Sequence, residues 1–179
     1  MVRRNTVVAG DLLGWSRRAI ITITKARHFM VGVFSLPDSA DESVKEIIEY
    51  WSSLCDGDIL PDRADIDPVE IPLLLPGVTL VEVERDPWRF RFRLMGSEVV
   101  LYYGRNLTGE WMDEAFPHFP STLTKADLKR TAESGAPNYR IGQPQLTYEK
   151  SYVQIERVML PFRNRGEDVG IVLIYSLLE

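Results

Sequence analysis

Two neighbouring stretches in which apolar and polar residues alternate constrain the fold of this chain most strongly. The later stretch alternates four apolar residues with three arginines: Trp88, Phe90, Phe92 and Leu94 with Arg89, Arg91 and Arg93. A period of two is that of a β-strand with one buried face. Residues 78–84 alternate in the same way, and Arg85-Asp86-Pro87 between the stretches is typical of a turn. The sequence therefore predicts an antiparallel hairpin whose apolar face other elements must cover.

Helical spacing precedes the hairpin. Apolar residues recur at helical spacing between positions 44 and 54, and Ser39 with Glu42 predicts a capping box. With Gly57 as the stop, a helix is expected over about 40–56. The aspartate-rich stretch 56–67 does not have the spacing of a calcium-binding loop, so caps and turns are the preferred interpretation. Asp67-Pro68 predicts the start of a second, short helix that reaches about Leu75.

Helices and then further strands are expected after the hairpin. Capping and breaking residues favour helices over 97–103 and 121–134, with a shorter one within 108–116. Strands are expected near 137–141, 148–162 and 169–177. Two strands, a helical block and three more strands predict an α+β domain with an antiparallel sheet.

Charge is distributed unevenly along the chain. The net charge is −5, but residues 1–38 carry six Lys and Arg against two Asp. The acidic remainder argues against a dedicated nucleic-acid binder. Residues 1–38 are interpreted as a basic arm outside the domain 39–179, and three alternatives stay open for them. They are a flexible segment, a misassigned start with Met30 as the alternative, or a basic amphipathic anchor on a membrane surface.

Residue counts exclude several kinds of site and favour the cytoplasm. A single cysteine, Cys55, allows no disulfide within the chain, which fits a reducing compartment. With His28 and His118 as the only histidines, a zinc site of Cys and His is excluded as well. Charged residues interrupt the longest apolar stretch, so no membrane span is expected.

Several short motifs, in this order, resemble the PAS family, in particular a subfamily of small alphaproteobacterial proteins. The resemblance covers about residues 44–177 and rests on segments 50–51, 60–61, 66–68, 71–76, 91–96, 103–109, 131–137 and 156–162. It implies a five-stranded antiparallel sheet in the order 2-1-5-4-3, with short helices on one face that close a pocket and a leading N-terminal helix. It also implies signalling through a bound ligand or a protein partner, without naming the ligand.

The resemblance places a set of residues near the expected pocket. The candidates are Arg93, Tyr102, Tyr103, Trp111, Met112, Phe116 and Arg157. For the aromatic and Met residues, plain core filling is the alternative. The row Arg89, Arg91 and Arg93 is expected to pair with Glu82 and Glu84, because a nucleic-acid surface would need the aromatic residues on the same face of the strand. Arg157 lies on an apolar strand face, so it is expected to pair with a carboxylate, Glu98 or Asp113, or to meet an anionic ligand.

Cofactor chemistry and catalysis are not favoured. Haem would need an axial ligand such as a helical His, yet His118 stands among prolines and His28 lies outside the domain. Flavin photochemistry needs a reactive Cys in an inner helix, whereas Cys55 lies on the leading helix. No motif for nucleophilic catalysis or phosphate binding is present, so no enzymatic activity is expected.

Two function classes remain: a small-molecule sensor, or a constitutive protein-interaction adaptor without a ligand. In both, the signal would leave through protein contact, and a homodimer is expected. The candidate surfaces are the open face of the sheet and the stripe Ile47, Ile48 and Trp51, unless that stripe covers the domain's own core.

Overall fold

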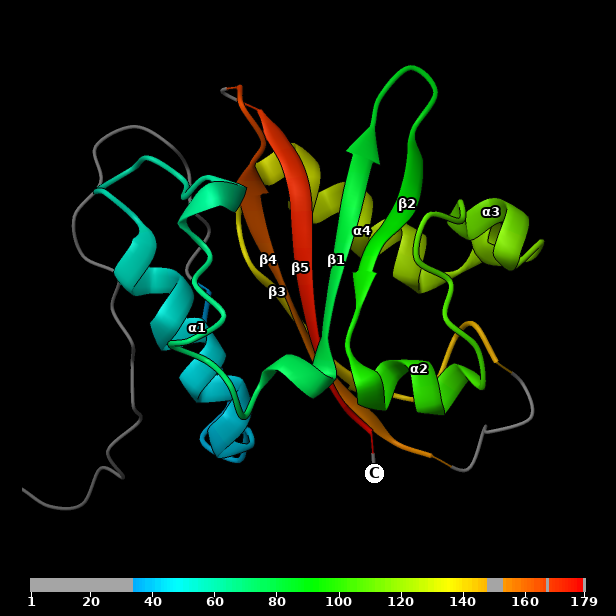
Figure 1. Cartoon of the computed structure of the whole chain (residues 1–179), viewed down its shortest axis with the longest axis horizontal. Helices are drawn as coiled ribbons and strands as arrows, with labels where there is room; N and C mark the ends of the chain where they lie inside the picture. Colours follow the sequence, from blue (N-terminus) through cyan, green and yellow to red (C-terminus); the bar gives the residue numbers. More distant parts are fainter. Residues whose placement is uncertain (1–33, 148–152, 167, 179) are drawn as a thin grey trace, which may run out of the picture.

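The computed structural model describes residues 34–147, 153–166 and 168–178. Within them, five strands form one antiparallel sheet in the order β2-β1-β5-β4-β3 (Figure 1). The strands are β1 (Val78–Glu84), β2 (Arg89–Met95), β3 (Asn138–Gly142), β4 (Ile155–Arg163) and β5 (Val169–Leu178). The expected fold class and strand order are therefore confirmed. Residues 1–33 of the basic arm, with Met30 and His28, lie outside the described residues, as does the 148–152 part of the expected fourth strand.

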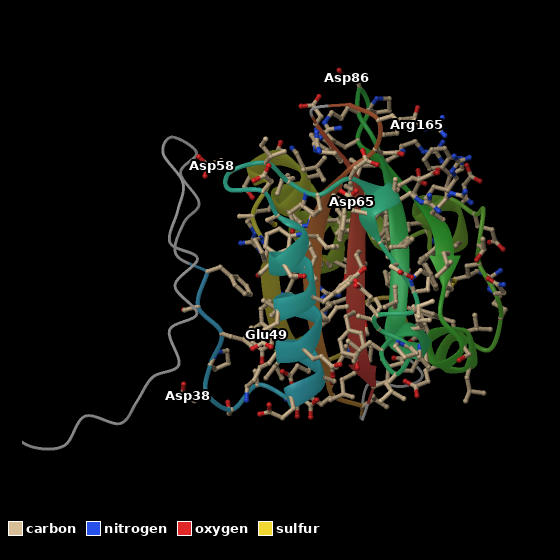
Figure 2. The ribbon with its side chains drawn as sticks, turned by 60° about the vertical axis from the view of Figure 1, so that its left-hand side comes forward. Asp38, Glu49, Asp58, Asp65, Asp86 and Arg165 are labelled. Carbon is tan, nitrogen blue, oxygen red and sulfur yellow. The ribbon has the colours of Figure 1, made fainter. Side chains whose placement is uncertain are left out.

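Helices cover both faces of this sheet. The α-helices are α1 (Glu42–Leu54), α2 (Ser97–Tyr103), α3 (Met112–Ala115) and α4 (Leu123–Ser134), and the 3₁₀ helices are η1 (Arg63–Asp65), η2 (Leu75–Gly77) and η3 (Phe119–Ser121). Figure 2 shows α1 lying over the sheet, with α4 on the far side. We call the face under α1 the outer face and the face under α2, α3 and α4 the inner face.

Alternation along the strands builds a separate core on each face. In β4 and β5, Val158 and Leu173 belong to the outer core, whereas Met159 and Ile174 belong to the inner core. The middle parts of both strands, residues 158–162 and 171–175, are therefore buried on both faces, which explains why they contain no charged residue.

The N-cap of the leading helix lies two residues after the expected cap, Ser39. Asp41 is the N-cap, and its carboxylate accepts the backbone N–H of Ser43 at 2.8 Å. The Ser39 cap was wrong because Ala40 is buried in a turn closed by its N–H bond to the Pro37 carbonyl. Order also reaches further upstream than expected, since Phe34 and Leu36 pack against the outer core.

The second expected helix is absent from the described residues 67–75, which form successive turns before η2. Asp67 does cap a backbone N–H, that of Val69 at 2.9 Å, but no α-helix follows. Pro68 suits a helix start, but Pro72 in the middle of the segment lacks the backbone N–H that a continuing helix would need. The segment instead inserts Ile71 and Leu74 into the outer core.

A register shift near the end of the hairpin moves one residue to the other face. The pairing of β1 with β2 slips between Leu80 and Val81, so that Leu94 lies opposite Leu80. Leu94 is therefore 43% exposed on the outer face instead of buried with Phe90 and Phe92. Strict alternation predicted the wrong face for Leu94, because a β-bulge adds a residue to the strand without a sign in the polar and apolar pattern.

Candidate functional site

A small hollow lies between the inner face of the sheet and the helices that cover it. Its volume is about 40 Å³. The sheet contributes Thr79, Ile174 and Ser176, among others, and α2 contributes Tyr102 and Tyr103. Further walls come from α3, α4 and the segment between β3 and β4: Met112, Thr124, Pro144, Gln145 and Leu146.

The size of the hollow limits what it can hold. With roughly 10–15 Å³ needed per water, it has room for about three water molecules. Pockets for larger ligands measure about 300–1,000 Å³. Haem or flavin therefore does not fit the hollow in this conformation.

Arg157 is the one cation among the described residues that line the hollow, and α4 holds it in place. Its two terminal nitrogens donate to the Thr124 hydroxyl at 2.9 Å and to the Asp127 carboxylate at 3.0 Å. Arg140, opposite Arg157 on β3, donates twice to the same carboxylate, at 2.6 and 2.8 Å, and Arg130 contacts it as well. One buried carboxylate thus joins α4 to β3 and β4.

The charges in this cluster shift two pKa values. Burial alone would raise the pKa of the Asp127 carboxyl, but Arg140 and Arg157 outweigh it, so the pKa lies below its usual value. Burial lowers the pKa of the Arg157 guanidinium, and Asp127 opposes that effect. Arg157 stays charged at neutral pH because an arginine starts from a very high pKa.

The fold and its hollow agree with a family relationship to known proteins. The model of the PAS domain family matches residues 39–174. The chain belongs to the PAS domain family. Neither the curated proteins nor the solved structures that were compared with it gave a significant match. Membership indicates a sensory or signalling domain, in line with the strand order of the sheet.

Four of the seven predicted pocket residues line the hollow of this PAS domain: Tyr102, Tyr103, Met112 and Arg157. Phe116 lies one layer away, with its ring centroid 5.4 Å from that of Tyr103. Arg157 pairs with Asp127 instead of Glu98 or Asp113, because its strand neighbours α4 and not α2 or α3.

Trp111 and Arg93 lie elsewhere in the PAS domain. Trp111 pairs with the edge strand β2 through an isolated bridge to Arg91. The guanidinium carbons of Arg89 and Arg91 lie 4.2 and 5.2 Å from the centroid of its ring. Arg93 is at the rim of a separate hollow of about 320 Å³, beside Arg63 and Arg165.

The arginine row of β2 is paired with carboxylates, although with a different set than expected. Arg91 and Arg93 both contact Glu82, the latter at 3.4 Å. Arg89 lies opposite Glu84 in the ladder but turns to α3, where it donates to Asp113 at 2.9 and 3.0 Å and to Glu114 at 2.7 Å.

The apolar stripe of α1 covers the PAS domain's own sheet. Ile47, Ile48 and Trp51 are at most 4% exposed and belong to the outer core. The Trp51 indole N–H donates to the Pro161 carbonyl at 2.9 Å. The stripe therefore covers the domain's own core, which was the alternative to a docking surface. Neither the stripe nor the sheet face beneath it is exposed in this chain.

Two other residues considered for chemistry have structural contacts. His118 contacts the Gln145 carbonyl at 3.1 Å through Nε2. Burial raises the pKa of the Cys55 thiol to about 11, so this thiol is protonated at neutral pH.

The sequence analysis missed the α4 side of the site. Thr124, Asp127 and Thr131 are all buried polar residues on one face of α4. Their spacing of three and four residues was a signal, since it places polar groups on the same side as the apolar Leu128.

No helix among residues 34–147, 153–166 and 168–178 combines the length and apolarity that a membrane span needs. Within those ranges, no three side chains of His, Cys, Asp or Glu gather into a group able to hold a metal ion.

Proposed function

We propose that this PAS domain is a cytoplasmic sensor without catalytic activity, which binds a small ligand in the inner hollow and signals through protein contact. The observation that carries the proposal is the hollow itself, which is lined by a largely buried arginine beside tyrosine, threonine and serine residues. Such a mixture of apolar walls and a few polar groups is typical of ligand sites.

Native mass spectrometry of the untagged chain, combined with thermal melting against a panel of small metabolites, tests the binding. We expect a bound small molecule or a raised Tm with at least one compound. The substitution Ser176→Leu fills the hollow and should abolish the effect, whereas Ser97→Leu, the same change at an exposed position, should keep it. Absence of any bound mass and of any shift would refute the sensor.

A constitutive adaptor is the second candidate, and the small volume of the hollow favours it. Because the hollow has a volume of only about 40 Å³, the domain needs no ligand to complete the packing of its core. Its partly exposed arginine and tryptophan side chains at Arg89, Arg91 and Trp111 are of the types enriched in protein interfaces.

A homodimer remains part of both proposals, and its interface must lie outside the buried α1 stripe. We expect native mass spectrometry to show two subunits, and Trp111→Ala to return the protein to a monomer. The buried Trp51→Phe change should leave the dimer intact, because Trp51 contacts its own chain. A wild-type monomer at micromolar concentration would contradict the dimer. A dimer that survives Trp111→Ala would exclude the surface around Trp111 as its interface.

A further inference from the structure

Arg157 has a guanidinium donor that the protein leaves unused. Its terminal nitrogens are taken by Thr124 and Asp127, but its Nε–H is buried and has no hydrogen-bond partner among the described residues. Buried donors are nearly always paired, so an unpaired one on a side chain that lines the hollow calls for an acceptor there.

The charge around Arg157 is also incompletely balanced. Asp127 is 1% exposed and is shared with Arg130 and Arg140, whose side chains are 59% and 33% exposed. Water can solvate those two arginines, whereas Arg157 is only 12% exposed and must share a single carboxylate with them. A buried cation that is only partly neutralised favours a further anion nearby.

The walls of the hollow carry one positive charge, several hydrogen-bond donors and no negative charge among the described residues. The described residues that line it include Arg157 but no Asp and no Glu. Hydroxyl and amide donors surround the space, from Thr79, Tyr103, Gln145 and Ser176. Burial raises the pKa of the Tyr103 phenol, so that its hydroxyl stays protonated and can donate at neutral pH.

From these observations we propose that the hollow binds a small planar oxyanion the size of acetate, which accepts the Arg157 Nε–H. The volume of about 40 Å³ admits formate, acetate or nitrate but not a dicarboxylate or an aromatic acid. This inference rests on the proposed sensor function and specifies its ligand class. With about four heavy atoms, the ligand can reach a Kd on the order of tens of micromolar at best, and weaker binding is expected.

Titration of the full-length wild-type chain with sodium acetate tests the inference directly. The Arg157 Nε–H resonance in a ¹⁵N-resolved NMR spectrum should shift in a saturable manner, because this group is the proposed donor. Acetamide, the neutral isostere, and sodium chloride at equal ionic strength should leave it unchanged. Equal responses to acetate and acetamide would overturn the anion assignment.

Substitutions separate binding from folding. Arg157→Lys should weaken acetate binding about tenfold or more, because it removes the Nε–H. Arg140→Lys is the matched control, since it alters a partner of the same Asp127 outside the hollow and should change the affinity less than about twofold. If Arg157→Lys fails to fold, Ser176→Leu serves instead, and it should abolish the shift of Arg157.

The outcomes distinguish this inference from the proposed function. A neutral molecule bound in the hollow would refute the oxyanion and leave the sensor standing. Binding of neither acetate, formate, nitrate nor any neutral metabolite would refute both. Acetate binding that persists unchanged in both Arg157→Lys and Ser176→Leu would place the anion elsewhere and refute the inference.

Discussion

Asp127 is the carboxylate through which α4, β3 and β4 are joined, and it is almost fully buried. Asp127→Asn would leave Arg157 buried without a counter-charge, so we expect a loss of about 3 kcal/mol or more in the free energy of unfolding. Urea denaturation measures it. Asp113→Asn, which alters a 34% exposed partner of Arg89, should cost about 1 kcal/mol or less. Similar losses in both variants would contradict this role for Asp127.

The same carboxyl predicts how stability depends on pH. Its pKa is lowered in the folded protein, so the unfolded chain takes up a proton first as the pH falls. The stabilisation by Asp127 is therefore complete above the ordinary carboxyl pKa of about 3.9 and is lost as the pH falls through the folded pKa. Unfolding free energies measured from pH 7 to pH 3 should fall less steeply in Asp127→Asn, and parallel curves would disprove the assignment.

Gly96 stands where β2 meets α2 against the turn of η2. A Cβ added there would lie 2.3 Å from the carbonyl oxygens of Leu75 and Pro76, which are backbone atoms that cannot rotate away. We expect Gly96→Ala to cost about 2 kcal/mol or more, as overpacking does. At Gly142 a Cβ would meet nothing within 4 Å, so Gly142→Ala should be neutral or slightly stabilising. Comparison of the two Tm values tests the close approach.

At the scale of elements, α1 is an integral layer of the domain and not an appendage. Ile48 is 1% exposed in the outer core, whereas the neighbouring Glu49, labelled in Figure 2, is exposed. Ile48→Ala should therefore lower the free energy of unfolding by about 2–4 kcal/mol, and Glu49→Ala by less than about 0.5 kcal/mol. A stable Ile48→Ala protein that merely loses its dimer would indicate that the stripe serves a partner.

Local patterns predicted the elements whose causes are local. The hairpin follows from alternation in residues 78–94, and α2 ends as expected at Gly104, where φ is 71°. Prediction failed where other elements decide the outcome. Residues 67–75 form turns and no helix, and these turns bury Ile71 and Leu74 in the outer core. Leu94 is displaced by a β-bulge, which the pattern of polar and apolar residues does not encode.

At the scale of the whole molecule, the site was predictable only in part. The resemblance to the PAS family supplied the strand order and placed Tyr102, Tyr103 and Arg157 around one hollow. The partner of Arg157 was missed because Asp127 lies 30 residues away, and only the packing of α4 on the sheet brings the two together. The apolar stripe of α1 was visible in the sequence, but the surface that it covers was not.

The two cores share the same central strands, which has a consequence for the whole domain. Val158 and Leu173 contribute to the outer core and their neighbours Met159 and Ile174 to the inner core, so neither layer can be lost without exposing β4 and β5. We therefore expect unfolding to be a single cooperative transition. A signal from the inner hollow would use the same strands to reach α1.

Ile48→Ala provides the test of this coupling, because it removes contacts from the outer core alone. Native-state hydrogen exchange reports the free energy of opening of the most protected amides in α4, on the inner face. In Ile48→Ala this free energy should fall by as much as the free energy of unfolding that urea denaturation measures for the whole protein. Glu49→Ala should leave the protection of α4 unchanged. If Ile48→Ala lowers protection in α1 but not in α4, the layers open independently, and the sheet does not couple the hollow to the outer face.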